Sequence, residues 1–272
     1  MIRLTDREFN TFTEYLKQHV GINLTKKRTL IEGRMNNYLL NHGYDDYGSY
    51  LNMLFNDKTG QELSRVVNYL TTNYSYFMRE WEHFEYYKTT ILPQWKERIS
   101  NRDLRVWSAG CSTGEEPYTL AMITDEFLGK ESAAWDKRIL ATDISERVLN
   151  HAKEGIYTDE GLEKVPAMWK TQYFNRLPDG YWQVKDSLKK EVIFRFFNLM
   201  DPVFPFKKKF HVIFCRNVMI YFDTETKAKV VQKYYDALEE GGYLIVGQSE
   251  SVDRTKSGFR YVMPAVYKKE RS

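Results

Sequence analysis

Apolar residues recur at helical spacing through the first ~70 residues, and no alternating strand pattern interrupts them. Thr5 and Glu8 are spaced as a capping box, which predicts a helix beginning at this point. Thr25 is a plausible N-cap for a second helix, and Asn41-His42-Gly43 would end it. The pattern therefore predicts a small bundle of four helices. The apolar positions that define the four faces are Phe9, Phe12, Leu16 and Val20; Leu30, Ile31, Met35, Tyr38 and Leu39; Tyr47, Tyr50, Leu51, Leu54 and Phe55; and Leu63, Val66, Val67 and Leu70.

The pattern changes after about residue 100, where short apolar runs alternate with amphipathic segments. This alternation predicts a mostly parallel, doubly wound α/β sheet. One of the expected helices would end at Gly241-Gly242, a good C-cap signal. The expected strands span 104–109, 139–143, 192–199, 210–216 and 243–248, the expected helices begin at 115 or span 145–153 and 224–239, and an edge hairpin is expected over 259–268.

One segment breaks this alternation and predicts a β-hairpin. Tyr173-Phe174 and Tyr181-Trp-Gln-Val184 would be its strands, with Pro178-Asp-Gly180 as the turn. We interpret the hairpin as a small insertion, and an edge extension without a role is the alternative. The predicted organisation is a helical bundle domain over 1–72, a linker segment and helix over 73–100, and an α/β domain over 101–272 with a β insertion at about 169–191.

The charge balance excludes two classes of protein. Of 272 residues, 40 are Lys or Arg and 37 are Asp or Glu, so the formal net charge is only +3. This near balance argues against a dedicated duplex-binding protein, and the hydrophobic content of 42% argues against a disordered polyelectrolyte. No apolar run approaches the roughly 18–20 residues that span a bilayer, and the charged N-terminal segment is unlike a signal peptide. With only two cysteines, Cys111 and Cys215, we expect a reduced, cytoplasmic protein.

A glycine-bearing turn follows the first expected strand and is a candidate for ligand binding. Gly110 and Gly114 would let a ligand approach the backbone, although a tight strand–helix connection needs the same residues. Asp143 ends the second strand, where a carboxylate can bind ribose hydroxyls or cap the next helix. Glu115 and Glu116 follow the turn directly, so they would repel phosphates and attract an ammonium or sulfonium group. These features favour S-adenosylmethionine over NAD or ATP.

Three distinctive segments occur in order along the chain. They are Thr71-Thr-Asn-Tyr-Ser-Tyr-Phe-Met-Arg-Glu80, Ser108-Ala-Gly-Cys-Ser-Thr-Gly-Glu-Glu-Pro-Tyr118 and Cys215-Arg-Asn-Val-Met-Ile-Tyr-Phe222. With them, nearly the whole chain resembles the bacterial chemotaxis receptor glutamate O-methyltransferases, the CheR-type family. The resemblance implies the doubly wound sheet of class I S-adenosylmethionine methyltransferases with a small inserted β-subdomain, preceded by a small all-α domain. It also implies the reaction: glutamate side chains of methyl-accepting chemotaxis receptors become methyl esters during adaptation, and S-adenosylhomocysteine is released.

The resemblance further implies where the cofactor binds. Glu116 would hold the methionine amino group, although Glu115 is the other possible partner, and Asp143 would hold the ribose. Ser75 stands where many family members have Thr, and the hydroxyl is kept. No metal is expected. The implied cofactor-binding set is Asn73, Ser75, Arg79, Glu116, Asp143, Asn198, Leu199, Arg216 and Asn217, with Asn198 and Leu199 beside the adenine.

Two residues are implied to be catalytic. Arg79 would orient the substrate carboxylate through paired hydrogen bonds, and the alternative is a surface ion pair with Glu80 or Glu82. Tyr221 would position one carboxylate oxygen, and the alternative is a core aromatic residue. A glutamate side chain is already ionised near neutral pH, so methyl transfer from a sulfonium needs no general base. The chemistry instead requires positioning and the exclusion of water.

The implied partner is the acidic, helical cytoplasmic domain of these receptors, with no nucleic acid and no insertion into the membrane. The basic run Lys26-Lys-Arg28 with Arg34 is a candidate docking face, or simply a solvated helix face. The β-subdomain binds a receptor's C-terminal peptide in some family members, and the sequence leaves that open. Two other functions also stay open: methylation of RNA or a small molecule, and a regulatory domain that binds S-adenosylmethionine or a receptor without catalysis.

Overall fold

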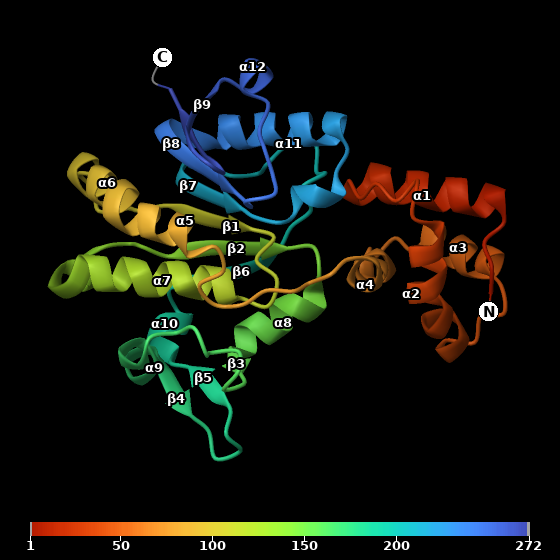
Figure 1. The fold of residues 1–272 in the computed structure, drawn as a ribbon, viewed down its shortest axis with the longest axis horizontal. Coiled ribbons are helices and arrows are strands. Elements are labelled where there is room, and N and C mark those ends of the chain that lie inside the picture. Colours follow the sequence, from red (N-terminus) through yellow and green to blue (C-terminus); the bar gives the residue numbers. More distant parts are fainter. Residues whose placement is uncertain (1, 271–272) are drawn as a thin grey trace. The chain divides into compact units, whose positions relative to one another are not determined.

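We describe residues 2–270 of the chain in a computed structural model. The contacts between residues divide the chain into two compact units. The first comprises Met1–Asn73, Asn198–Pro202 and Tyr221–Lys227, and the second comprises Tyr74–Phe197, Val203–Ile220 and Ala228–Ser272. Figure 1 labels the elements of both units. These two units are defined by contacts between residues alone. The division of the chain into domains at residues 72 and 100 therefore stays a prediction.

Four helices form most of the first unit, as the apolar spacing predicts. The capping box is confirmed, because the Thr5 hydroxyl accepts a hydrogen bond from Glu8 N and Thr5 N donates to the Glu8 carboxylate at 2.8 Å. The predicted cap at Thr25 is wrong, because its N–H and hydroxyl both donate to the Asn23 side chain and Lys27 precedes the helix instead. The helices are α1 (Asp6–Val20), α2 (Arg28–Asn41), α3 (Tyr47–Asn56) and α4 (Gln61–Leu70). Their fully buried core includes Phe12, Leu16, Ile31, Met35, Leu39, Tyr47, Tyr50 and Val66.

Two short segments from the second half of the chain complete the first unit. The Asn198 side chain donates a hydrogen bond to the carbonyl oxygen of His19 at 2.7 Å, at the end of α1. Lys17 Nζ, two residues earlier in α1, lies 2.8 Å from a carboxylate oxygen of Asp223. The helical unit is therefore discontinuous in sequence.

A seven-stranded sheet organises the second unit, in the order β6-β2-β1-β7-β8-β10-β9. Neighbouring strands from β6 to β8 run parallel, while β10 pairs antiparallel with both β8 and β9. The predicted mostly parallel sheet and the hairpin at its edge are confirmed. The strands are β1 (Val106–Ala109), β2 (Ile139–Asp143), β6 (Val192–Phe196), β7 (Phe210–Cys215), β8 (Leu238–Val246), β9 (Phe259–Met263) and β10 (Val266–Lys269).

Helices cover both faces of this sheet (Figure 1). Successive side chains of a strand point to opposite faces, so Trp107 and Ser108 of β1 face different helices. Trp107 packs against Tyr234 of α11, whereas Phe214, which pairs with Ser108, packs against Phe84 of α5. None of the helices within residues 2–270 combines the length and the apolar character needed to cross a bilayer. The helical segments are α5 (Trp81–Tyr86), the π-helical η1 (Tyr87–Ile91), α6 (Leu92–Arg98), α7 (Glu115–Leu128), η2 (Gly129–Ala134), α8 (Glu146–Glu154), η3 (Met219–Tyr221), α11 (Thr224–Ala237) and α12 (Arg254–Ser257).

One predicted helix end is wrong. The pattern places it at Gly241-Gly242, whereas α11 ends at Ala237 and β8 follows at once. Leu238 pairs with Phe210 of β7, and the register of the pairing then shifts. Gly241 has a φ of +77°, a backbone conformation that glycine adopts readily. The glycines therefore absorb an irregularity within a strand and do not cap the helix.

The insertion forms a second, three-stranded sheet in the order β3-β5-β4, with antiparallel neighbours. The predicted hairpin is confirmed as β4 (Phe174–Arg176) and β5 (Trp182–Val184). The sequence pattern did not predict β3 (Ile156–Tyr157), because a strand of two residues shows no detectable alternation. Two short helices, α9 (Ala167–Tyr173) and α10 (Asp186–Lys189), flank the hairpin in sequence.

Candidate active site

The turn after β1 brings the backbone close to its neighbours. Gly110 has a φ of +81°, and a Cβ atom there would overlap Val218 Cγ2. Gly114 precedes α7 with a φ of +98°, and a Cβ atom there would lie 2.8 Å from Ala152 Cβ. Both positions therefore require glycine for their conformation and for space. Packing within the unit is enough to explain why these two positions are glycines. Their role in binding a ligand therefore stays a prediction.

Asp143 lies at the carboxyl end of β2, beside this turn. Its Oδ2 accepts a hydrogen bond from Ser112 N at 2.9 Å, and its Oδ1 accepts one from Ser145 N at 3.0 Å. The residue that caps α8 is Ser145, so capping is not the function of Asp143. Burial raises the pKa of Asp143, and the surrounding amide donors oppose that shift. The amides fix the carboxylate, while each oxygen keeps acceptor capacity for a further hydroxyl.

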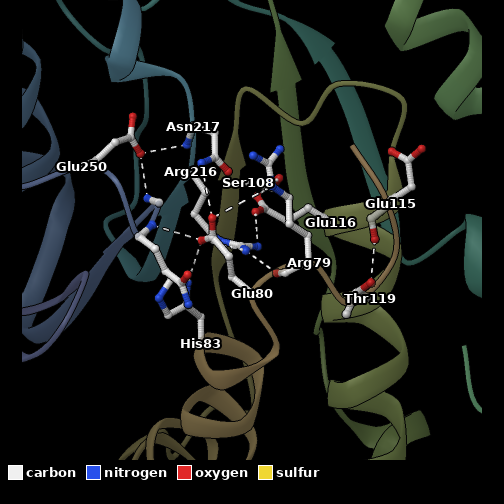
Figure 2. A network of polar contacts seen from close by, with 12 residues as sticks. Arg79, Glu80, His83, Ser108, Glu115, Glu116, Thr119, Arg216, Asn217 and Glu250 are labelled. Atoms are coloured by element: carbon white, nitrogen blue, oxygen red, sulfur yellow. Dashed lines mark hydrogen bonds and ion pairs between the residues drawn. The ribbon is translucent and has the colours of Figure 1, made fainter. Parts of the chain in front are cut away.

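Glu116, the second residue of α7, forms one end of a buried polar network (Figure 2). Its Oε1 accepts a hydrogen bond from Ser108 Oγ at 2.7 Å, and its Oε2 accepts one from Arg216 Nη1 at 3.0 Å. The Arg216 side chain is 3% exposed, and its guanidinium lies 4.9 Å from the centroid of the Phe84 ring. Burial raises the pKa of Glu116, whereas the Arg216 guanidinium lowers it. The Nε of Arg216 is buried without a hydrogen-bond partner, so this guanidinium retains an unused donor.

Arg79 lies in a strained turn that precedes α5. Its neighbours Met78 and Glu80 have φ values of +63° and +54°, which are uncommon for residues other than glycine. Arg79 Nη1 donates a hydrogen bond to the carbonyl oxygen of Tyr74 at 2.8 Å, and Arg216 Nη2 donates one to the carbonyl oxygen of Arg79. The Arg79 Nε lies 4.0 Å from Glu80 Oε1, the ion pair considered as an alternative role. The Glu80 carboxylate lies closer to Arg216 than to Arg79. The hydrogen bonds to Tyr74 and from Arg216 therefore hold both the side chain and the backbone of Arg79 in place.

Glu80 forms the other end of the network. Its carboxylate accepts hydrogen bonds from Arg216 Nη2 at 3.2 Å and from Asn217 Nδ2 at 3.3 Å. Burial acts to raise the pKa of Glu80, but Arg216 and the other donors outweigh it and hold that pKa below its ordinary value. His83 Nδ1 lies 3.4 Å from Glu80 Oε2, and burial together with Arg216 lowers the pKa of His83 to about 4. Arg216 therefore bridges two carboxylates, beside a neutral imidazole.

A third carboxylate, that of Glu250, joins the loops that follow β7 and β8. Its Oε2 accepts hydrogen bonds from Asn217 N at 2.8 Å and Gly247 N at 2.7 Å, and its Oε1 accepts one from Ile220 N at 3.0 Å. The residue is 6% exposed. Burial raises the pKa of Glu250, and its amide donors oppose that shift. Asn217, with a φ of +59°, is thus held through its backbone by Glu250 and through its side chain by Glu80.

Glu115 occupies different surroundings from Glu116. The Thr113 hydroxyl lies 2.8 Å from both Glu115 carboxylate oxygens, and the Ser75 side chain also hydrogen-bonds to Glu115. Burial raises the pKa of Glu115, and these donors oppose it. Glu115 therefore ties the turn to the segment that carries Ser75, while Glu116 is the acid that contacts Arg216.

Four of the predicted residues belong to the first unit: Asn73, Asn198, Leu199 and Tyr221. The Asn73 side chain donates a hydrogen bond to Asn68 Oδ1 at 3.1 Å, and Leu199 is 9% exposed. The Tyr221 hydroxyl accepts a hydrogen bond from Thr72 N at 3.1 Å. Tyr221 is partly exposed, so it is not a buried core aromatic. The roles of these four residues stay predictions.

The structure brings four other predicted residues into one network: Arg79, Glu116, Arg216 and Asn217. Sequence reasoning did not select Glu80 and Glu250, which hold this network together. Glu80 ends the first distinctive segment, and Glu250 lies in the loop after β8, whereas Asp143 is the last residue of β2. Two carboxylates around one buried guanidinium leave an excess of negative charge, which suits a cationic ligand better than a phosphate.

Comparison with known proteins identifies similar chains over nearly the full length. Residues 7–71 match the family described as CheR methyltransferase, all-alpha domain, and residues 73–267 match CheR methyltransferase, SAM binding domain. A chemotaxis protein methyltransferase of Borreliella burgdorferi is 42% identical, covering 98% of this chain and 96% of that protein. A probable chemotaxis protein methyltransferase of Rhizobium etli is 36% identical (83% and 85%), and the chemotaxis protein methyltransferase of Escherichia coli is 34% identical (98% and 92%).

Proposed function

Because this chain belongs to the CheR methyltransferase family, we propose that it methylates glutamate side chains of methyl-accepting chemotaxis receptors. The predicted family and its S-adenosylmethionine-dependent methyl transfer in chemotaxis are confirmed. The acceptor glutamates, the receptor partner and a cytoplasmic location are parts of the proposal. One observation carries it furthest: Arg216 joins Glu116, a candidate for the cofactor's ammonium group, to the main chain of Arg79.

The residues of the second unit fit the chemistry of S-adenosylmethionine. The Glu116 carboxylate suits an ammonium group, and the unused Nε donor of Arg216 suits a carboxylate. Asp143 offers acceptor capacity for ribose hydroxyls at the carboxyl end of β2. We therefore assign the amino-acid end of the cofactor to Glu116 and Arg216 and the ribose to Asp143.

The remaining task of the protein is to position an acceptor that is already reactive. Bound S-adenosylmethionine supplies a methyl group on a sulfonium, whose carbon–sulfur electron pair stays on sulfur when a glutamate oxygen takes the methyl group. The guanidinium of Arg79 can orient that carboxylate through paired hydrogen bonds. Its Nη1 is anchored on Tyr74 O at 2.8 Å, which limits how many donors it commits to the substrate. A looser grip is favourable, because a strong clamp would stabilise the ground-state carboxylate and slow the transfer.

The basic face proposed for receptor docking is smaller than the sequence suggests. Arg28 donates hydrogen bonds to Leu4 O at 2.7 Å and to Asp6 at 2.6 Å. Arg34 donates to Leu70 O at 2.9 Å and so holds the end of α4. Lys26 and Lys27 are exposed. We therefore restrict the proposed electrostatic docking surface to these two lysines.

The test of function uses radiolabelled S-adenosylmethionine and receptor cytoplasmic fragments. We expect base-labile label on the receptor protein, because a glutamyl methyl ester hydrolyses in base. The Arg79→Ala variant should lose most of this label, while Arg138→Ala, at an exposed ion pair, should keep it. Base-stable label on RNA or on a small molecule would overturn the proposed acceptor. Cofactor binding without any transfer would favour a regulatory role instead.

A further inference from the structure

The mechanism proposed above does not use Glu80, although Glu80 completes the segment that carries Arg79. Its carboxylate accepts hydrogen bonds from three groups: Arg216 Nη2 at 3.2 Å, Asn217 Nδ2 at 3.3 Å and Gln248 N at 3.2 Å. The Glu80 side chain is only 14% exposed. Arg216 and Asn217 follow β7, and Gln248 follows β8. Glu80 therefore fastens its own turn to the carboxyl ends of two central strands (Figure 2).

The turn needs such fastening because its backbone is strained. Met78 and Glu80 are both in the left-handed region, with φ values of +63° and +54°. This conformation is unfavourable for a residue other than glycine and persists only when its surroundings impose it. Arg79 lies between them, and its carbonyl oxygen accepts a hydrogen bond from Arg216. The position of the Arg79 backbone thus depends on contacts with the loop after β7.

We propose that Glu80 is a positioning residue for Arg79. By holding Arg216, Asn217 and Gln248, its carboxylate keeps the turn in the conformation that presents the Arg79 guanidinium to the substrate glutamate. This inference rests on the proposed function, because it assumes that Arg79 orients the acceptor carboxylate.

The loops on the cofactor side have an anchor of their own. Glu250 binds the backbone N–H groups of Asn217, Ile220 and Gly247, and none of these bonds involves Glu80. Arg216 likewise keeps its hydrogen bond to Glu116 if Glu80 is lost. Removing the Glu80 charge should therefore loosen the turn and leave the cofactor loops in place. The loss of the Glu80 charge should therefore lower turnover and leave cofactor affinity nearly unchanged.

The experiment compares Glu80→Gln with the matched control Glu82→Gln in the full chain. Glu82 is an exposed carboxylate two residues away, and it accepts a hydrogen bond from Gln248 Nε2 at 3.4 Å. Calorimetry with S-adenosylhomocysteine gives cofactor affinity, and labelled methyl transfer to a receptor fragment gives kcat and KM. For Glu80→Gln we expect kcat to fall about 10- to 100-fold, because moving a catalytic group by about 1 Å can lower the rate by that factor. Its Kd should stay within about threefold, and Glu82→Gln should match the wild type in both quantities.

A double-mutant comparison shows whether Glu80 acts through Arg79. If it does, Glu80→Gln should cause almost no further loss in an Arg79→Ala background. Glu80→Asp keeps the charge on a shorter side chain and should give a kcat between those of the wild type and Glu80→Gln. If circular dichroism shows that Glu80→Gln is unfolded, Glu80→Asp takes its place in both comparisons. Equal losses in turnover and affinity, additive losses in the double variant, or wild-type turnover would each overturn the inference. A wild-type protein that labels no receptor would overturn the proposed function itself.

Discussion

Arg216 offers the sharpest test of the network, because its removal should leave two carboxylates without their counter-charge. The Arg216 side chain is 3% exposed, and its partners Glu80 and Glu116 are 14% and 12% exposed. Removing one partner of a buried ion pair typically costs about 3–5 kcal/mol, because the remaining charge is stranded away from water. In Arg216→Met, the carbonyl oxygen of Arg79 also loses a donor. We therefore expect the free energy of unfolding to fall by about 3–5 kcal/mol.

The assay is urea unfolding of the protein without cofactor, monitored by circular dichroism. Arg138→Met is the matched control, because Arg138 lies 2.8 Å from Asp136 with 52% and 48% of the two side chains exposed. Exposed ion pairs contribute about 0–1 kcal/mol, so this variant should lose no more than that. The double variant Arg216→Met, Glu116→Gln should recover part of the loss, since it removes one of the two stranded charges.

Equal destabilisation by Arg216→Met and Arg138→Met would contradict this prediction. A further loss of stability when Glu116→Gln is added to Arg216→Met would contradict it as well. Either result would mean that water, and not Arg216, compensates the carboxylates in the folded state.

Four other predictions concern individual side chains or, in the last case, a pair of lysines. Tyr221→Phe should lower turnover and leave S-adenosylhomocysteine affinity nearly unchanged; an equal loss of binding in calorimetry would contradict the positioning role. Asp143→Ala should instead weaken that affinity by about tenfold, as expected for lost hydrogen bonds to a charged group, and unchanged binding would refute the ribose assignment. Burial lowers the pKa of His211 to about 3, so below about pH 6.5 the unfolded chain binds more protons than the folded chain. The His211 contribution alone should therefore lower stability by about 2 kcal/mol between pH 7 and pH 5, and His211→Gln should abolish that contribution in urea titrations at both pH values. Changing Lys26 and Lys27 to Glu should weaken binding of receptor fragments mainly at low salt; a salt-independent affinity would exclude electrostatic docking.

Local signals predicted much of the fold. The capping box at Thr5 and the apolar face that follows it act within one helix, so the sequence displays both partners. The end of α11 escaped prediction because its cause is not local. Gly241 resembles a helix cap in the sequence, but pairing of Leu238 with Phe210 starts a strand before that glycine is reached.

Charge patterns were less informative than apolar patterns. Arg28 and Arg34 look like a solvated basic face, yet they donate hydrogen bonds to backbone carbonyl oxygens 24 and 36 residues away. The same limitation applies to the candidate site. The motifs selected Arg79, Glu116 and Arg216 as individual residues, whereas the Arg216–Glu80 contact joins residues 136 positions apart. No spacing rule displays such a pair, so only the folded chain identifies it.

The discontinuity of the helical unit has a consequence for how the chain is made. During synthesis the N-terminal helices leave the ribosome first, but Lys17 and the carbonyl oxygen of His19 find their partners in Asp223 and Asn198. Domains generally fold in the order of synthesis, from the N-terminus onward. Here helix α1 is synthesised early, whereas its partner Asp223 is synthesised late. The helical unit therefore reaches its final state only when most of the polypeptide has left the ribosome. A fragment that ends after α4 would reproduce the helices and lack the segments that finish them.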